Sequence, residues 1–215
     1  MLFMSIKTNL EIIKARVARA AGRVGRDSKE IKLLVAGKYA DIKQLEELIE
    51  AGQKLIGENR AQDLTRKYAV IGDQAEWHFI GHLQRNKVKD VIPLITMLHS
   101  LDSIRLADEL ERQLGKINKV LPVLIEVNVA GEVTKSGISL QELDELVKHC
   151  HNLLHLKLKG LMTMNQHHFH TLRQLAKSYN LPELSMGTSQ DFEMAIEEGA
   201  TMIRLGRIVF LKTIV

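Results

Sequence analysis

The stretch "IKLLVAGKYADIKQLEELIEAGQKLIGEN" (residues 31–59) holds the pattern that decides the fold. A short aliphatic run at 31–37 predicts a buried strand, the apolar spacing of 41–52 predicts a helix that ends at a glycine, and 54–59 predicts a second strand. Two strands joined through a helix form a right-handed unit with parallel strands. The first strand runs directly into a single lysine, Lys38, for which a strand interior has no obvious use.

The same alternation of strand and helix continues along the chain. Further strands are predicted at 76–83, 94–102, 120–129, 154–164, 182–187 and 201–206, with helices at 60–71, 84–92, 103–117, 139–150, 166–179 and 189–199 and an extra amphipathic helix at 3–22. This pattern predicts a single (β/α)8 barrel domain over residues 1–215. An open doubly wound sheet is the alternative, but its first strand is usually followed by G-x-G-x-x-G, which "AGKYAD" does not match.

Composition excludes several classes of protein. The 30 Lys and Arg residues are interleaved with 26 Asp and Glu, and aromatic residues are only 4% of the chain, so we expect no nucleic-acid partner. One cysteine, Cys150, excludes an intramolecular disulfide and a multi-cysteine zinc site. The N-terminal segment has no signal-peptide core, and no apolar run reaches the ~18 residues of a membrane span. We therefore expect a cytoplasmic protein without membrane association.

Two groups of histidines are candidates for metal binding. They lie at 149–151 and 167–170, where adjacent residues do not share one face of a helix or strand. No carboxylate or cysteine pattern completes a site around them. We expect exposed histidines and no metal site.

Polar residues or glycine mark the end of each predicted strand. In a parallel barrel these carboxyl ends converge on one mouth, where ligands bind. Closure of the barrel pairs 201–206 with 31–37 and so brings Arg204 near Lys38. Two cations repel each other unless an anionic or electron-rich group lies between them. The mouth is therefore predicted to bind such a group.

The segment "LSMGTSQDFEMAI" (184–196) predicts an anion site at the same mouth. Gly187 lets the backbone approach a ligand closely. Either Thr188 or Ser189 is expected to cap the following helix, and the spacing of Thr188 to Asp191 fits a capping box. Free N–H groups at such a helix start bind anions.

The adjoining segment "RLGRIVF" (204–210) adds Gly206 and Arg207. The loops after strands seven and eight often hold a phosphate group in (β/α)8 enzymes. A lysine on strand one facing a phosphate site indicates a cofactor that carries both an aldehyde and a phosphate, namely pyridoxal 5'-phosphate (PLP).

The motifs "LLVAGKYAD", "GENRAQ", "WHFIGHLQRNKVK", "HSLDS", "VLIEVNVAGEVTKSGI", "LKGLMTM", "LSMGTSQDFEMAI" and "RLGRIVF" cover nearly the whole chain in order. In these motifs the chain resembles the pyridoxal phosphate homeostasis protein family, which is related to the N-terminal barrel domain of alanine racemase. The resemblance implies an alanine racemase N-terminal-like barrel in which Lys38 forms a Schiff base with PLP. It further implies that Arg204 faces the pyridine nitrogen, and that Ser189 and Gly206, with their loops, hold the phosphate. By the same resemblance, Asn59 and His82 fall beside the ring and Met186 packs near the cofactor.

Four positions depart from the family pattern. Gly37 replaces a small hydroxyl residue before the lysine, and Tyr39 replaces the threonine after it. Arg207 replaces a threonine that contacts phosphate, and Leu211 replaces a closing glycine. Arg207 is therefore expected either to exchange a hydroxyl contact for a charge or to block part of the site.

The expected function is to bind PLP and to buffer it or deliver it to apo PLP-dependent enzymes, as a monomer. Arginine only donates hydrogen bonds, so Arg204 would leave the pyridine nitrogen unprotonated and weaken carbanion chemistry. Racemisation also needs a second base on the opposite face; Tyr39 neighbours Lys38 and is poorly placed for that, and we expect no second domain to supply one. The alternatives are a PLP-dependent racemase of low activity and a barrel that has lost its cofactor and acts through protein contacts.

Overall fold

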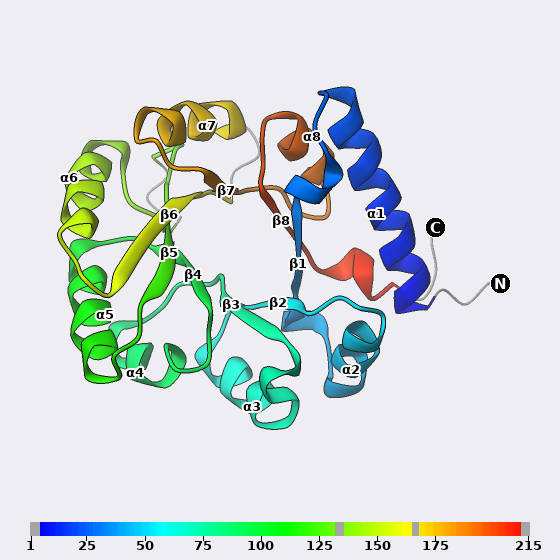
Figure 1. Cartoon of the computed structure of the whole chain (residues 1–215), viewed down its shortest axis with the longest axis horizontal. Helices are drawn as coiled ribbons and strands as arrows, with labels where there is room; N and C mark the ends of the chain where they lie inside the picture. Colours follow the sequence, from blue (N-terminus) through cyan, green and yellow to red (C-terminus); the bar gives the residue numbers. More distant parts are fainter. Residues whose placement is uncertain (1–4, 132–135, 165–167, 212–215) are drawn as a thin grey trace.

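A computed structural model of the chain describes residues 5–131, 136–164 and 168–211. Its parallel strands close into a barrel in which each strand pairs with its neighbours in chain order (Figure 1). They are β1 (Lys32–Ala36), β2 (Leu55–Glu58), β3 (Glu76–Phe79), β4 (Met97–Leu101), β5 (Leu121–Glu126), β6 (Leu156–Met162), β7 (Glu183–Ser185) and β8 (Met202–Leu205). The predicted barrel is confirmed, and the open sheet is excluded because β8 pairs with β1, with Leu34 opposite Arg204.

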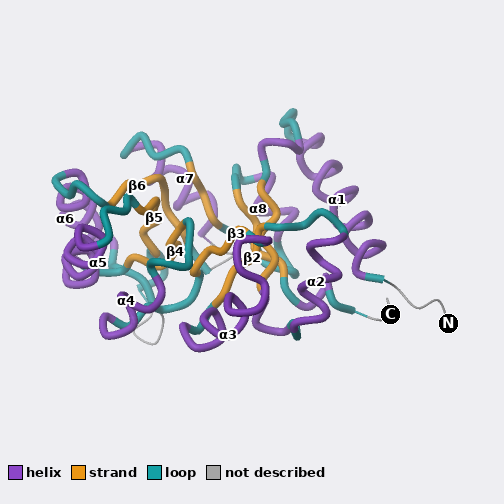
Figure 2. Tube along the Cα trace, turned by 60° about the horizontal axis from the view of Figure 1, so that its bottom comes forward, coloured by secondary structure: helices purple, strands orange, loops and turns teal. Residues whose placement is uncertain are grey.

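Helices surround the strands on the outside of the barrel (Figure 2). They are α1 (Ile6–Arg23), α2 (Ile42–Glu50), α3 (Ala61–Ile71), α4 (Val88–Val91), α5 (Ile104–Lys116), α6 (Leu140–His151), α7 (Phe169–Ser178) and α8 (Phe192–Glu197). Short 3-10 turns are η1 (Ser28–Glu30), η2 (Gly37–Tyr39), η3 (Gly72–Gln74), η4 (Arg85–Lys87) and η6 (Arg207–Val209). The predicted helix 84–92 is divided between η4 and α4, and the first residues of the predicted helices 3–22 and 166–179 lie outside the described residues.

The extra helix α1 packs against α2, α8 and η6, beside the point where the barrel closes (Figure 1). Ser5 caps it by accepting a hydrogen bond from the N–H of Thr8. On its inner face the buried amide of Asn9 donates to the carbonyl oxygens of Val209, at 3.0 Å, and Leu211, at 2.8 Å. The first helix therefore holds the segment that follows the last strand.

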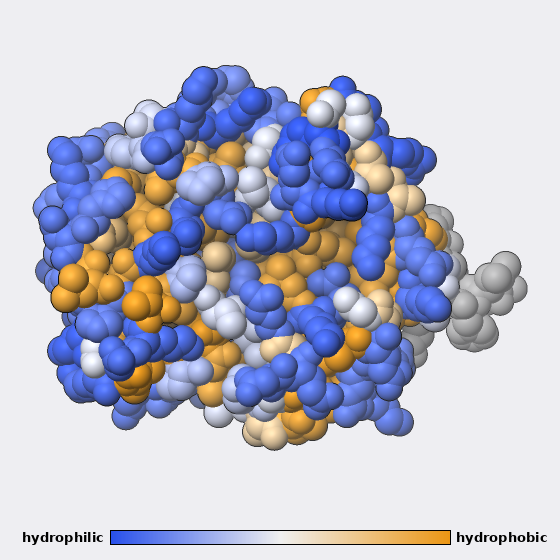
Figure 3. All heavy atoms as spheres, in the orientation of Figure 1, coloured by the Kyte–Doolittle hydropathy of each residue, from blue (hydrophilic) through white to orange (hydrophobic). Residues whose placement is uncertain are grey.

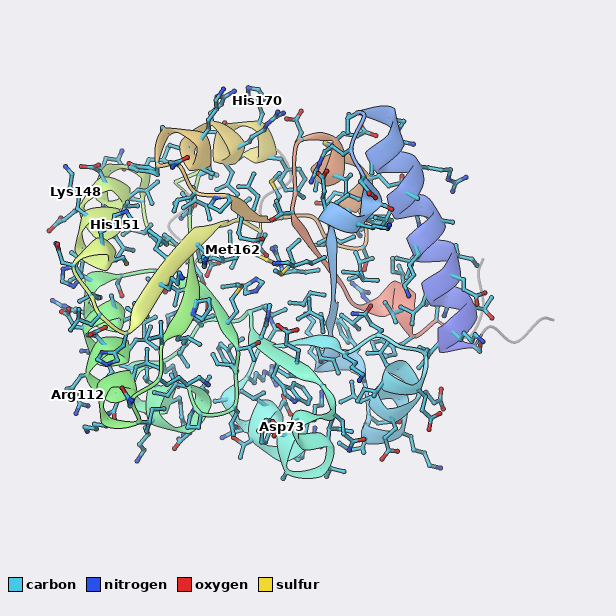
Figure 4. The ribbon with its side chains drawn as sticks, viewed as in Figure 1. Asp73, Arg112, Lys148, His151, Met162 and His170 are labelled. Carbon is cyan, nitrogen blue, oxygen red and sulfur yellow. The ribbon has the colours of Figure 1, made fainter. Side chains whose placement is uncertain are left out.

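Each strand alternates between two cores, as the two-residue side-chain period requires. In β1, Val35 packs outward against the helices, whereas Leu34 and Ala36 face the inside of the barrel. The inner cluster also contains Ile80, Met97, Leu124, Met162 and Met202. Figure 4 shows Met162 inside the ring of strands, while the other labelled residues lie on the outer surface.

Polar side chains share this inward register. On β3, Trp77 and Phe79 belong to the outer core, so the intervening His78 points inward. His99, Ser185 and Arg204 are also buried. On the face shown in Figure 3, hydrophilic residues predominate around the edge, and hydrophobic residues are visible between them toward the middle. No helix in the described part of the chain is long and apolar enough to cross a membrane.

Replacing Asn9 with alanine should destabilise the fold by about 1–3 kcal/mol, because two carbonyl groups lose their donor in a buried setting. Urea denaturation followed by circular dichroism measures this loss. Lys14→Ala, at an exposed position of the same helix, is the control and should change stability by less than about 0.5 kcal/mol. Equal midpoints for the two variants would contradict the prediction.

Candidate functional site

A pocket of about 470 Å³ lies at the mouth of the barrel. It is lined by Ala36, Lys38, Tyr39, Asn59, Ile80, Met164, Thr188, Ser189, Gln190, Arg204, Gly206, Arg207, Ile208 and Leu211. These residues come from the ends of β1, β2 and β8 and from the loops that follow β3, β6, β7 and β8. The pocket therefore brings together most of the residues that the sequence predicts to bind a cofactor.

Three of the predicted residues lie outside this lining. Met186 is fully buried in the outer core, and Gly187 lies behind the pocket wall with a φ of 92°. A Cβ atom on Gly187 would lie 2.6 Å from the Cβ of Ala195, so this position requires glycine for space as well as conformation. His82 lines a neighbouring pocket of about 270 Å³ that shares Asn59 with the first.

His82 lies beyond the end of β3 at Phe79 and lines only the neighbouring pocket. Its Nδ1 atom lies 3.0 Å from Oδ2 of Asp102, and its ring is largely exposed. A ring-side role for His82 stays a prediction.

Lys38 lies in the η2 turn, directly after β1, and its side chain is exposed to the pocket. A second lysine supports this turn from below: the buried Nζ of Lys67 donates to the carbonyl oxygen of Gly37 and to Oε1 of Glu58, both at 2.6 Å. A Cβ atom on Gly37 would lie 2.6 Å from the same Glu58 oxygen. The glycine before Lys38 therefore leaves room for the Glu58–Lys67 ion pair.

The ion pair between Glu58 and Lys67 lies almost entirely out of contact with water. Burial raises the pKa of the Glu58 carboxyl, and the hydrogen bond from Lys67 opposes that rise. Removing one partner of such a pair commonly costs about 3–5 kcal/mol, because the other charge stays buried. The pair fixes the backbone that carries Lys38.

Tyr39 lies between two cations at the edge of the pocket. The Nζ atom of Lys38 is 4.7 Å from the centre of its ring, and Cζ of Arg207 is 5.6 Å from it. The hydrogen bond and charge of Lys38, together with the charge of Arg207, lower the pKa of the Tyr39 phenol. The sequence predicts two cations at the mouth, Lys38 and Arg204. Arg207 is a third, and the ring of Tyr39 lies close to both Arg207 and Lys38.

The loop between β7 and α8 forms another wall of the pocket. Oγ of Ser189 accepts a hydrogen bond from the N–H of Gly206 at 3.3 Å, which joins this loop to the one after β8. No backbone hydrogen bond within the described residues uses the N–H groups of Ser189 and Gln190. Free donors on a pocket wall suit an anionic ligand.

The expected capping of α8 by Thr188 or Ser189 is wrong. The helix begins at Phe192 with Asp191 as its N-cap residue. Thr188 donates both its N–H and its hydroxyl to Oδ1 of Asp191, so the carboxylate closes the loop as an acceptor. The pair that matched a capping box in sequence forms one half of it, because the carboxylate accepts from the N–H of Thr188. The Thr188 hydroxyl donates to that carboxylate instead of accepting from the N–H of Asp191.

Arg204 lies at the inner end of the pocket and is 4% exposed. Nη1 donates to Oγ of Ser185 at 2.6 Å, and Nη2 donates to the carbonyl oxygen of Thr163 at 2.8 Å. Burial lowers the pKa of Arg204 to about 10, so the guanidinium remains charged near neutral pH. These bonds use only part of its donor set.

Two further groups near the mouth lack an obvious structural role. Oδ1 of Asn59 is the one buried side-chain polar atom without a hydrogen-bond partner in the described part of the chain. Burial, and then the charge of Asp102, raise the pKa of Glu126, at the end of β5, to about 7. Within residues 5–131, 136–164 and 168–211, no group of three His, Cys, Asp or Glu side chains could hold a metal ion.

Sequence reasoning missed several members of the site. Lys67 falls on a helix, where the sequence pattern does not distinguish it from solvated lysines, and Gln190 and Ile208 carry no motif signal of their own. The two-residue alternation of their strands predicts that His78 and His99 face the inside of the barrel, but the sequence does not indicate which residues they contact there.

Comparison with known proteins agrees with this geometry. The profile of the alanine racemase N-terminal domain family matches residues 6–213. The pyridoxal phosphate homeostasis protein of Aquifex aeolicus is 42% identical, over 96% of this chain and 98% of its own length. The protein of the same name from Escherichia coli K12 is 37% identical, over 95% of each chain.

A solved structure extends the comparison. PipY of Synechococcus elongatus, determined with PLP bound, is 28% identical and superposes with a TM-score of 0.78 over 91% of this chain and 100% of PipY. With a barrel of this topology and near-complete coverage by such relatives, the chain belongs to the alanine racemase N-terminal domain family and, within it, to the pyridoxal phosphate homeostasis proteins.

Proposed function

We propose that this protein binds PLP in the pocket at the barrel mouth, carries it as a Schiff base on Lys38, and buffers it or delivers it to apo PLP-dependent enzymes. The names of the relatives at 42% and 37% identity, and the bound PLP of PipY, support this proposal. A single domain over residues 1–215, a monomeric state and a cytoplasmic location are further parts of it. The single cysteine, Cys150, which is buried and unpaired, suits a reducing compartment.

The observation that carries the proposal is the presence of three matching groups in one pocket. Lys38 supplies an amine for the aldehyde of PLP, the loops of Ser189 and Gly206 supply backbone donors for the phosphate, and Arg204 supplies a donor for the ring nitrogen. The volume of about 470 Å³ falls within the usual range for small-molecule sites. PLP requires all three kinds of contact.

Polar atoms that lack a hydrogen-bond partner at the pocket also fit such a ligand. Oδ1 of Asn59 is a buried acceptor without a donor, and a hydroxyl group on the ligand ring would satisfy it. The unused N–H groups of Ser189 and Gln190 lie where an anion would accept from them. We therefore place the phosphate at the β7 and β8 loops and the ring between Asn59 and Arg204.

The presence of Arg204 favours a function as a carrier of PLP rather than as a catalyst. When bound, PLP supplies an aldehyde and a ring whose power to withdraw electrons depends on protonation of its nitrogen. The guanidinium of Arg204 stays charged near neutral pH and can only donate, so it leaves that nitrogen unprotonated. The ring would then stabilise a carbanion weakly.

The lining of the pocket offers no base opposite Lys38. Its titratable side chains among the described residues are Lys38, Tyr39, Arg204 and Arg207. The ring of Tyr39 packs against the Lys38 ammonium itself, so its phenol cannot serve as a base on the opposite face. We propose little or no catalysis and retain a racemase of low activity as the alternative.

Two departures from the family pattern lie at the end of the pocket where we place the phosphate of PLP. Arg207 lies on η6, where its guanidinium packs over Tyr39 and lines the pocket. We infer that its charge replaces the hydroxyl contact that the family usually has. Leu211 lines the same end and narrows it where a glycine is usual.

Lys38→Ala should abolish both the near-visible absorbance of protein-bound PLP and the covalent adduct trapped by borohydride. The reason is that Lys38 supplies the only amine among the described residues that line the pocket. Lys43→Ala, on the exposed face of α2, is the matched control and should retain both. Absence of an adduct at Lys38 in the unaltered protein would instead favour a barrel that acts without PLP.

Arg207→Thr should raise the dissociation constant for PLP by about three- to tenfold and weaken its dependence on salt, because one charge near the phosphate is removed. Titration at two ionic strengths measures both effects. Binding of pyridoxal, which lacks the phosphate, should change little. A tighter complex in the variant would show that Arg207 blocks the site.

Incubation of the PLP-loaded protein with L-amino acids in deuterated water should give little exchange at Cα. Arg204 would leave the ring nitrogen unprotonated, and the described residues of the pocket lining include no base opposite Lys38. Mass spectrometry of the recovered amino acid measures the exchange. Steady exchange that Lys38→Ala abolishes would establish the racemase-type alternative.

A further inference from the structure

A line of hydrogen bonds crosses the inside of the barrel and ends at Arg204. His78 lies between two of its members: Nε2 is 3.3 Å from Oε1 of Glu76, and Nδ1 is 2.9 Å from Nε2 of His99. Nδ1 of His99 is 2.9 Å from Oγ of Ser185, which accepts from Arg204. Because β4 and β7 are not neighbours in the sheet, the contact between His99 and Ser185 bridges the barrel interior.

The middle of this line is sealed from water. His99 and Ser185 are 0% exposed and His78 is 3% exposed, whereas the side chain of Glu76 is 56% exposed. Only the two ends therefore reach solvent, Glu76 at the amino end of β3 and Arg204 in the pocket. Inside, water cannot replace a missing donor or acceptor, so each contact requires one proton between its two atoms.

The chemistry of Arg204 and Glu76, at the two ends, sets the direction from donor to acceptor along this line of hydrogen bonds. A guanidinium only donates and a carboxylate only accepts. Burial, with the charge of Arg204, holds the pKa of His99 well below its ordinary value, so its ring is neutral and carries a single N–H. The positions of the protons on His78, His99 and Ser185 have to be consistent with a donor at Arg204 and an acceptor at Glu76.

With both imidazoles neutral, one assignment satisfies every contact. The carboxylate of Glu76 requires the proton of His78 on Nε2, which leaves Nδ1 of His78 to accept from Nε2–H of His99. Nδ1 of His99 then accepts from the hydroxyl of Ser185, whose oxygen accepts from Arg204. The opposite direction would place the lone pair of His78 Nε2 against a carboxylate oxygen.

We propose that Ser185, His99 and His78 are positioning residues that fix the Arg204 guanidinium at the inner end of the pocket, with Glu76 as the terminal acceptor. The inference rests on the proposed function in one respect, that Arg204 faces the ring nitrogen of PLP. None of the three touches the ligand site directly, because none lines the pocket. They act by giving Nη1 of Arg204 an acceptor whose own proton is committed elsewhere.

Without this acceptor, the guanidinium would be held only from its other side. Nη2 donates to the carbonyl oxygen of Thr163 and lies 3.0 Å from Sδ of Met164. Loss of the Nη1 contact would leave a charged donor unpaired in the barrel interior and favour rotation of the side chain toward the open pocket. The donor aimed at the ring nitrogen would then be misplaced.

The direction of the line can be measured in the protein without PLP. Where each ring carries a single proton, NMR of the ring nitrogens should show His78 and His99 both as the Nε2–H tautomer. Glu76→Leu, at the exposed end, should leave the fold intact and allow the Nδ1–H form of His78 to appear. An Nδ1–H form of either ring in the unaltered protein, or no change in Glu76→Leu, would overturn the assignment.

Ligand binding tests the positioning role with a matched pair of variants. The experiment compares the affinity for PLP with the affinity for an analogue whose ring nitrogen is replaced by C–H. His99→Leu should lower the preference for PLP over the analogue by about tenfold, because the Ser185 hydroxyl that accepts from Arg204 loses the acceptor of its own proton and is no longer held in place. His99→Gln should retain the preference within about threefold, since an amide can accept from Ser185 and donate to His78.

Two results separate this inference from the proposed function. Equal weakening of PLP and of the analogue in His99→Leu would mean general damage to the barrel and would overturn the positioning role. If the unaltered protein bound neither ligand, the proposed function would fail, while the tautomers measured without PLP would still decide the direction of the line.

Discussion

The pairing of β8 with β1 is the contact on which the rest of the molecule depends. It places Leu34 opposite Arg204 and brings the turn of Lys38 to the same mouth as Gly206 and Arg207. The same closure turns alternate side chains of every strand toward a common axis, so polar residues from opposite strands meet inside. An open sheet made from these elements would leave the amine and the phosphate loops on separate edges.

The mouth of this barrel is built at a cost in stability. A buried ion pair such as Glu58–Lys67 is often no more stabilising than well-packed apolar side chains would be. Here both partners are tied to the backbone of the site, since Lys67 also holds the carbonyl of Gly37. The histidine line beneath Arg204 has the same character, because it places polar atoms where an ordinary barrel interior holds Leu or Ile. Geometry near the pocket is thereby fixed at the expense of apolar packing.

The architecture and most of the pocket lining could be predicted from the sequence, whereas the contacts around the site could not. Strand and helix periods identify the barrel, and strand ends identify Lys38, Asn59 and Arg204 as neighbours. The direction of the hydrogen bond between the Thr188 hydroxyl and Asp191 depends on loop torsions, which residue spacing does not determine. His82 falls in the adjoining pocket beyond the end of β3, and strand boundaries are the least certain part of a pattern.

The bonds from Asn9 to the carbonyls of Val209 and Leu211 have a consequence for how the protein is made. The first helix completes its packing only when residues near the end of the described chain are in place. In the same way, β1 can form its pairing with β8 only after β8 has been made. Contacts between such distant parts of a sequence slow folding, since a long loop has to close before they form. During synthesis, Lys38 leaves the ribosome early, yet the pocket around it is assembled only after the final strand has emerged.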